Sequence, residues 1–269
     1  MERPKFENRN LWLFFLIAFV WSWIFWLPEV LWEFRLYLAP FGPFVAAFLL
    51  TYLKEKKDGV IKLLKKGLDY KVGKIWYIPP FLLMPAIASI SLLGAMLSGE
   101  TIPELAVLSQ PWLILGNFIY ILFLGGPFQE EFGWRGYALP RLQAHHNALV
   151  SSLMLGLVWA VWHLPLNLIS GANIQYGPQY AMAILMFLLG SIITLVPASI
   201  LFTWLYNNTG GSVLISLLFH TMMNLSTFVV FPVFTTKIGV LYYMSLIIFV
   251  AIAILIIYGH KKMVHEKTD

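Results

Sequence analysis

Three short polar motifs interrupt the apolar stretches of this 269-residue sequence, and each contains side chains able to do chemistry. They are Gln129-Glu-Glu-Phe-Gly-Trp-Arg135, Trp159-Ala-Val-Trp-His163 and His220-Thr-Met-Met-Asn224. Ionisable groups inside an apolar helix are costly, so where they are kept they are functional candidates. The chain has no cysteine, which excludes thiol nucleophiles and thiolate metal sites. Chemistry in these segments therefore depends on carboxylate, imidazole and amide groups.

The combination of Glu130, His163, His220 and Asn224 suits the activation of water. A glutamate in a cavity of low dielectric constant can act as a general base, and one histidine can help to hold the water. The other histidine and the asparagine amide can donate hydrogen bonds to the oxyanion of a peptide tetrahedral intermediate. One glutamate and two histidines could equally hold Zn²⁺ with an open position. The residue types leave both possibilities open.

Each motif also has a purely structural interpretation. Glu131 and Arg135 are four residues apart on one helix face and can pair as an interfacial ion pair. Glu130 points about 100° away from that face and has no intrahelical cation. His163 could hydrogen-bond a neighbouring helix, and His220 with Asn224, one turn apart, could do the same.

The spacing of the motifs predicts that they converge. A helix that extends to about Gln143 and a second that begins near Asn147 form an antiparallel hairpin with its turn at about residue 145. Glu130 precedes that turn by fifteen residues and His163 follows it by eighteen, so they lie within one helical turn of the same height. His220 lies roughly 13 Å into the bundle from the next glycine-rich turn on the same side.

The composition identifies the class of protein. Hydrophobic residues make up 59%, charged residues 12%, and the mean hydropathy is +0.77. Ordinary globular chains contain about 25% charged residues, so this chain cannot cover a water-facing surface. Disorder, coiled coils and nucleic-acid-binding arms are excluded, and membrane lipids are the expected surroundings.

Eight transmembrane helices are predicted, because a span needs roughly 20 apolar residues. Charge-free stretches run from Asn10 to Pro28, Leu36 to Leu53, Ile75 to Gly99, Leu105 to Gln129 and Ile238 to Gly259. The uncharged stretch between Arg141 and Lys237 has room for three more, with breaks at 171–178 and 207–211. The predicted fold class is therefore an all-α polytopic membrane protein, with a kink at Gly125-Gly-Pro127.

The distribution of charge predicts the orientation. With the N-terminus inside, the inner segments contain sixteen Lys and Arg and the outer loops only two. Both termini are therefore expected on the cytoplasmic side of the plasma membrane, and the first apolar segment is expected to be a retained span. The basic segment 54–74 includes a helical pattern over 59–70, which either lies on the anionic inner leaflet or only fixes the topology.

The three motifs together resemble those of the CPBP family. Glu130, Glu131 and Arg135 form an E-E-x-x-x-R pattern, Trp159 and His163 an aromatic-x-x-x-H pattern, and His220 and Asn224 an H-x-x-x-N pattern. That family groups type II CAAX prenyl proteases with the Abi bacteriocin-processing and self-immunity proteins. The resemblance covers roughly residues 105–231, and a tryptophan stands at 159 where phenylalanine is usual.

The resemblance implies an eight-helix fold with a cavity open to the cytosol, in which membrane-anchored peptides or proteins, including prenylated CAAX-type ones, are cut. By carry-over, Glu130 activates water with His163, while His220 and Asn224 steady the oxyanion. Glu131 and Arg135 support the site. The family has been described both as metal-free and as metal-dependent. No cofactor is the first expectation, because three of the polar residues already have distinct roles and the sequence shows no carboxylate partner for the histidines. Zn²⁺ on Glu130, His163 and His220 is the alternative.

The expected organisation has three parts. Residues 1–104 form the first three spans with the basic segment, 105–236 form the catalytic core, and 237–269 form the last span and a cytoplasmic tail. Two other functions remain open: a non-catalytic immunity or scaffold protein that binds a peptide in the same cavity, and a proton-coupled transporter. The complete motif set disfavours the first, and the clustering of polar groups toward one leaflet disfavours the second.

Overall fold

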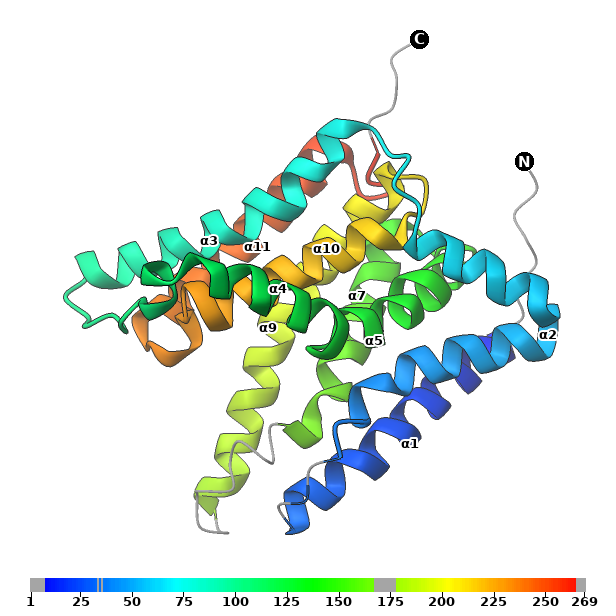
Figure 1. Cartoon of the computed structure of the whole chain (residues 1–269), viewed down its shortest axis with the longest axis horizontal. Helices are drawn as coiled ribbons and strands as arrows, with labels where there is room; N and C mark the ends of the chain where they lie inside the picture. Colours follow the sequence, from blue (N-terminus) through cyan, green and yellow to red (C-terminus); the bar gives the residue numbers. More distant parts are fainter. Residues whose placement is uncertain (1–7, 33, 35, 167–177, 265–269) are drawn as a thin grey trace.

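The computed structural model describes residues 8–32, 34, 36–166 and 178–264, and all regular structure in these ranges is helical (Figure 1). The α-helices are α1 (Asn8–Trp32), α2 (Gly42–Gly67), α3 (Ile78–Leu97), α4 (Pro111–Leu124), α5 (Pro127–Gly133), α6 (Leu139–Gln143), α7 (Ala148–Trp162), α9 (Pro178–Asn208), α10 (Val213–Asn224) and α11 (Ile238–Tyr258). Two π-helical turns, η4 (Trp134–Ala138) and η5 (Leu225–Val230), continue α5 and α10. Short 3₁₀ turns are η1 (Ala39–Phe41), η2 (Lys74–Tyr77), η3 (Ala106–Ser109) and η6 (Val233–Thr235). The predicted all-α class is confirmed.

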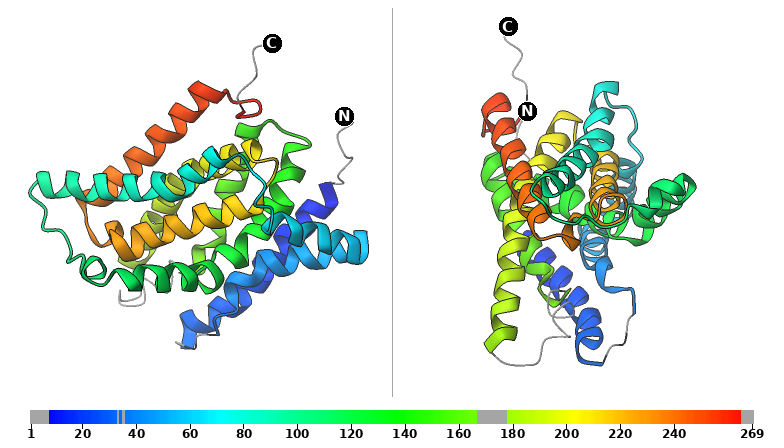
Figure 2. Two further views of the ribbon diagram at one scale, coloured as in Figure 1. Left: turned by 45° about the horizontal axis from the view of Figure 1, so that its top comes forward. Right: turned by 90° about the vertical axis from the view of Figure 1, so that its left-hand side faces the viewer.

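Helix α10 lies at the centre of the molecule. It contacts α3, α4, α5 and α9, while α1 packs on α2, α3 on α11, and α7 on α9. Figures 1 and 2 show these pairs around α10, with α1 and α2 together on one side and α3 and α11 together on the other. The segment α5–η4–α6 is thereby enclosed between α2, α7 and α10, so polar groups on it lie in the interior.

The membrane-spanning character is confirmed, but the count of eight spans is not. Among the described residues, six helices are long and apolar enough to cross a membrane. They are Asn10–Glu29, Lys74–Leu97, Ala148–Leu166, Ala181–Asn208, Val213–Val230 and Ile238–Tyr258. The pair Pro111–Leu124 and Pro127–Gln143, bent by 41°, makes a seventh if it is one broken span.

The span expected over 36–53 accounts for the difference. In the structure its helical part is the first half of α2, which continues through the lysines to Gly67 and is bent at Lys56, where φ is 55° and ψ is −152°. From Gly42 to Leu53 the helix rises only about 18 Å, short of the roughly 30 Å of a hydrocarbon core. Its second half carries lysines, and α2 therefore does not meet the criteria for a span.

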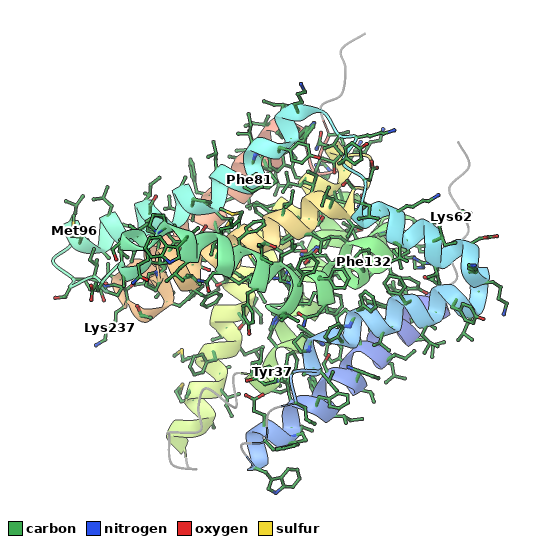
Figure 3. The ribbon with its side chains drawn as sticks, viewed as in Figure 1. Tyr37, Lys62, Phe81, Met96, Phe132 and Lys237 are labelled. Atoms are coloured by element: carbon green, nitrogen blue, oxygen red, sulfur yellow. The ribbon has the colours of Figure 1, made fainter. Side chains whose placement is uncertain are left out.

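The second half of α2 packs on the protein through small residues. Gly59, Leu63 and Gly67 are buried at four-residue intervals, whereas the lysines between them are mostly exposed. The Phe132 ring lies where a Cβ on Gly67 would be, so only glycine allows this approach. Figure 3 labels Phe132, which belongs to α5, and Lys62, which lies on the outer part of α2. The amphipathic pattern predicted over 59–70 is thus helical through Gly67, with its apolar stripe against α5 and η4.

The turns that set the depth of the motifs lie where they were expected. The helix breaks after Leu124, and α5 begins at Pro127. The α6–α7 turn is closed by Asn147, whose Oδ1 accepts a hydrogen bond of 2.8 Å from the backbone N–H of Val150. Gly210 and Gly211 have φ of 65° and 85° in the turn before α10. The break expected at 171–178 lies outside the described residues, except for its last residue, which begins α9.

Candidate active site

The break before α5 brings a glycine against the first glutamate of the motif. Gly126 has φ of 113°, a conformation that favours glycine, and its N–H donates to Oε1 of Gln129 at 2.7 Å. A Cβ on Gly126 would lie 2.8 Å from Oε1 of Glu130. The absence of a side chain at this position therefore leaves room beside the carboxylate.

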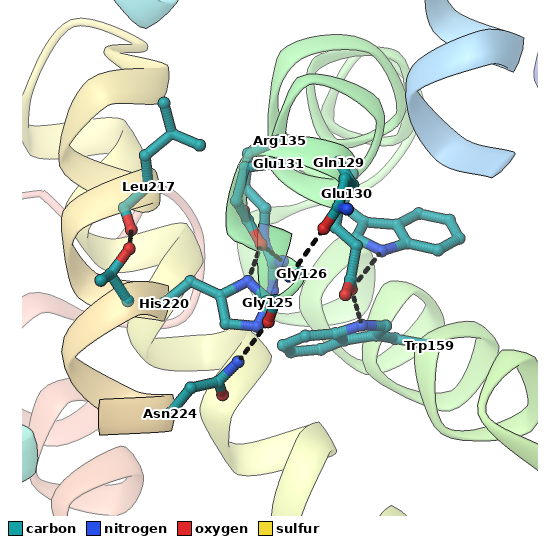
Figure 4. A network of polar contacts seen from close by, with 12 residues as sticks. Gly125, Gly126, Gln129, Glu130, Glu131, Arg135, Trp159, Leu217, His220 and Asn224 are labelled. Atoms are coloured by element: carbon teal, nitrogen blue, oxygen red, sulfur yellow. Dashed lines mark hydrogen bonds and ion pairs between the residues drawn. The ribbon is translucent and has the colours of Figure 1, made fainter. Parts of the chain in front are cut away.

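Glu130 is held by two indole groups rather than by a cation. Its Oε2 accepts hydrogen bonds from Nε1 of Trp159 at 2.8 Å and from Nε1 of Trp134 at 3.3 Å (Figure 4). The residue is 4% exposed. Among the described residues, none donates a hydrogen bond to its other oxygen, Oε1, which faces Gly126. One carboxylate oxygen is thus fixed and the other is left for a small ligand such as water.

Glu131 joins two of the motifs. Its Oε1 accepts from Arg135 at 2.7 Å, the pair expected from their spacing, and also from Nδ1 of His220 at 2.8 Å. Both Glu131 and Arg135 are fully buried. The Arg135 guanidinium lies 3.7 Å from the ring centroid of Phe202 and 4.5 Å from that of Trp159. The contact between Glu131 and His220 was not foreseen, and it orients the imidazole.

His163 presents a defined ring nitrogen. Its Nδ1 lies 2.9 Å from the backbone carbonyl of Trp159, and a carbonyl only accepts, so Nδ1 carries the proton. In the neutral imidazole, Nε2 is then the acceptor. The ring packs edge-on against Trp162, with centroids 4.7 Å apart. His163 follows the last residue of α7, where the helix ends.

Asn224 contacts the same glycine turn that Glu130 faces. Its Nδ2 donates to the carbonyl of Gly125 at 3.1 Å and is 3.8 Å from the position of a Cβ on Gly126. Figure 4 shows His220 and Asn224 on one face of α10, directed toward the turn that carries Gly125 and Gly126. The predicted one-face arrangement of His220 and Asn224 is observed.

Trp159 connects all three motifs. Besides its bond to Glu130, its ring lies 5.9 Å from that of His163 and 5.4 Å from that of His220, measured between centroids. Glu130 and His163 therefore both lie next to one indole. Sequence reasoning missed the roles of Trp159 and Trp134 as hydrogen-bond donors. The signal available was their spacing, since Trp134 lies one turn after Glu130 and Trp159 one turn before His163.

The donors of the zinc alternative are not grouped around one point. Within the described ranges, no three His, Asp or Glu side chains are arranged to hold a single metal ion. His220 uses Nδ1 for Glu131, and His163 uses Nδ1 for the Trp159 carbonyl. Such Nδ1 bonds are usual for metal-ligating histidines, so it is the spacing of the donors that does not fit the set Glu130, His163 and His220 as ligands.

Comparison with known proteins agrees with the motifs. Residues 111–226, which include every candidate site residue, match the family described as type II CAAX prenyl endopeptidase, Rce1-like. In these residues the chain is similar to type II CAAX prenyl endopeptidases. It is also 28% identical over 272 residues to a CAAX prenyl protease 2 of Methanococcus maripaludis, which covers 95% of this chain and 96% of that protein. The resemblance inferred from the three motifs is confirmed.

The similarity to this family supports the coarse function of the chain. It is a multi-pass membrane endopeptidase of the CAAX protease type, and its substrate is a protein or a peptide. The matched segment begins at the first residue of α4 and ends in η5, so it contains the bent pair α4–α5 and the central helix α10. The elements that hold the polar groups are therefore those that the family shares.

Proposed function

We propose that the chain cleaves a peptide bond inside the membrane with a water molecule that Glu130 activates. The observation that carries this proposal is the asymmetric environment of the Glu130 carboxylate. Two indole N–H groups fix Oε2, while Oε1 faces the space that Gly126 leaves open. A carboxylate held in one orientation with one free oxygen is suited to take a proton from a bound water.

The proposed water lies between Glu130 and His163. Nε2 of neutral His163 accepts a hydrogen bond from one O–H of this water. Oε1 of Glu130 takes the proton of the other O–H as the water oxygen attacks the carbonyl carbon, and the carbonyl electron pair moves to its oxygen to form the oxyanion. The C–N bond then breaks, and Glu130 returns the proton to the departing amine. The second proton of the water stays on the new carboxyl group, which releases it on ionisation. This scheme needs no metal ion.

His220 and Asn224 are the proposed oxyanion donors. An asparagine amide has two N–H donors, and the bond to the Gly125 carbonyl uses one of them. His220 donates from Nδ1 to Glu131, so it can donate to an oxyanion only from a protonated Nε2. The donor form is then the imidazolium, which the Glu131 carboxylate stabilises by a charge-assisted hydrogen bond. In this scheme Glu131 and Arg135 position His220 and do not touch the substrate.

The proposed substrate is a membrane-anchored peptide with a prenylated CAAX-type C-terminus. This assignment rests on the family and on the name of the archaeal relative. The test compares a farnesylated CAAX peptide with the same peptide lacking the lipid, both presented to the full chain in liposomes. Faster cleavage of the farnesylated peptide supports the assignment, whereas equal rates contradict it.

The decisive test of the mechanism is Glu130→Gln, which keeps the shape of the side chain and removes its basicity. We expect nearly complete loss of cleavage with an unchanged yield of folded protein. Glu104→Gln, at an exposed glutamate outside the site, is the control and should retain full activity. Cleavage by Glu130→Gln at the wild-type rate would discard the mechanism.

We also propose that both termini face the cytoplasm and that the protein resides in the plasma membrane. The asymmetry of sixteen to two in Lys and Arg supports this orientation. Reporter fusions after Asp269 and within the segment 171–178 should report opposite sides. The same side for both reporters would overturn the orientation.

A further inference from the structure

A basic pocket opens at the end of the molecule where the lysines gather, apart from the site around Glu130. It is an open pocket of about 750 Å³ between the α6–α7 turn and the residues that follow α11. Five basic side chains line it: His145, His146, His260, Lys261 and Lys262. None of its lining residues is acidic, as far as the chain is described. A smaller pocket of about 380 Å³ adjoins it and shares Lys262.

The wall that carries the two lysines is built onto the helix bundle. The carbonyls of His260 and Lys261 accept hydrogen bonds from the N–H groups of Leu149 and Ala148 at 3.1 and 2.9 Å. The first N–H groups of α7 are therefore already satisfied, and the pocket is not merely an open helix end.

The same segment is tied to α9. Asn207 Nδ2 donates to the carbonyl of Lys262 at 2.7 Å, and Asn208 Nδ2 donates to that of Met263 at 2.7 Å. Met263 is fully buried and has φ of 52°, which is uncommon for a residue with a side chain. If Lys261 and Lys262 served only to fix the membrane topology, their backbone would not need these hydrogen bonds to the helix bundle. Figures 1 and 2 show the end of α11, in red, beside the end of α9, in yellow.

More positive charge lies behind the pocket. Tyr206 lines both cavities, and Nζ of Lys66 donates to its hydroxyl at 3.4 Å. Burial lowers the pKa of Lys66, and the nearby Arg141 lowers it further, while Glu55 opposes them. The positive charge at the pocket therefore comes mainly from Lys261 and Lys262, and none of the described lining side chains opposes it with a negative charge.

The position of the pocket indicates where such an anion comes from. Spans α7, α9 and α11 begin or end at Ala148, Asn208 and Tyr258, all next to the pocket. The pocket therefore lies at the level where the apolar spans stop, which is the level of lipid headgroups. Exposed Ile256 and Ile257 occupy the last turn of α11 below it, in a position to meet acyl chains.

We propose that this pocket binds the phosphate group of an anionic phospholipid in the leaflet that faces the lysine-rich side. Histidine and lysine side chains donate hydrogen bonds to the phosphate oxygens, and the acyl chains extend along the apolar end of α11. Phosphate is favoured over a metal ion because, within the described residues, no three histidine or acidic side chains are arranged as metal ligands.

The test measures binding of dioctanoyl phosphatidylglycerol to the full chain in detergent by titration calorimetry. We expect saturable binding that weakens about tenfold or more in Lys261→Gln/Lys262→Gln, since two cations near the phosphate are lost. Both side chains are exposed and only their backbone carbonyls support the fold, so the double variant should keep its melting temperature. The matched control is Lys62→Gln/Lys65→Gln, which removes two exposed lysines of α2 and should bind as wild type.

Sodium phosphate as the second probe distinguishes the two sources of phosphate. If inorganic phosphate competes with the lipid but binds much more weakly than the lipid does, the result supports a lipid headgroup as the ligand. Binding of inorganic phosphate as tight as that of the lipid would overturn the lipid as the source. No saturable binding of either probe, or equal loss in both double variants, would overturn the pocket as a phosphate site.

Discussion

Trp159 donates a hydrogen bond of 2.8 Å from its indole Nε1 to Oε2 of Glu130, across 29 residues of sequence. Phenylalanine, which is usual at this position of the family's motif, has no such donor. In this chain Trp159, four residues before His163, therefore both packs between the motifs and orients the proposed base.

Replacing Trp159 by phenylalanine should lower kcat for peptide cleavage by about tenfold with little change in KM. The ring is kept, but one of the two donors that fix Oε2 is lost, and Trp134 alone holds it at 3.3 Å. The matched control is Trp162→Phe, because the buried Nε1 of Trp162 has no hydrogen-bond partner in the described structure. Equal loss of kcat in both variants would show that packing, not the hydrogen bond, matters.

Replacing Asn224 by alanine should slow cleavage by about 10²–10³-fold and leave measurable activity, as expected for one lost oxyanion donor. Asn117→Ala is a suitable control, since Asn117 also donates to a helix carbonyl but is exposed on α4. Steady-state kinetics of both variants check the prediction. A loss as complete as that of Glu130→Gln would contradict the assignment of Asn224 as one of two donors.

Removing the Arg135 side chain should destabilise the fold by about 3 kcal/mol, the lower part of the range for breaking a buried pair. The effect is moderated because His220 still donates to Glu131 in the variant. Thermal unfolding of Arg135→Ala in detergent measures this, with exposed Lys65→Ala as the control. Unchanged stability of Arg135→Ala would refute a stabilising role for the pair.

The hydrogen bonds of Glu100 predict that the stability of the fold depends on pH. Its carboxylate accepts hydrogen bonds from the backbone N–H groups of Lys237, Ile238 and Gly239 at the start of α11. The bond from Lys237, with those from Ile238 and Gly239, lowers the pKa of Glu100 below 4.5. Because the pKa in the folded state is lower, the carboxylate stabilises the fold above the unfolded pKa. That contribution is lost as the pH falls through the folded pKa.

The melting temperature of wild type should therefore exceed that of Glu100→Gln at pH 7, and the difference should shrink as the pH falls below 4.5. Glu104→Gln, at the next glutamate along the chain, should follow the wild-type curve. A constant difference between wild type and Glu100→Gln from pH 7 to pH 3 would contradict the role of ionisation.

Chelators decide between the two chemical types of site. We expect 1,10-phenanthroline and EDTA to leave cleavage unchanged and the purified protein to contain less than one metal ion per chain. The basis is the spacing of the donors, because within the described residues no three His, Asp or Glu side chains are grouped to hold one ion. Loss of activity that added Zn²⁺ restores would replace the metal-free mechanism by a zinc site.

Much of the fold followed from the sequence alone because membrane helices obey simple rules of length and charge. The apolar stretches gave most of the spans, and the turns at 125–127, 144–147 and 209–212 lie where glycine, proline and asparagine were expected to break the helices. The exception was α2. Its apolar half is too short to span a membrane, and its lysine-rich half packs on Phe132 through glycines, a contact that no local pattern reveals.

The sequence by itself singled out the candidate site residues and determined that Glu131 and Arg135 pair, because helical periodicity fixes the face that a residue occupies. Only the tertiary structure decided that Glu131 also holds His220, and that Trp159 and Trp134 orient Glu130. These bonds depend on the rotation and separation of packed helices and on the bend of 41° before α5. Such quantities are set by side-chain packing between distant segments, so the spacing of residues along one segment does not contain them.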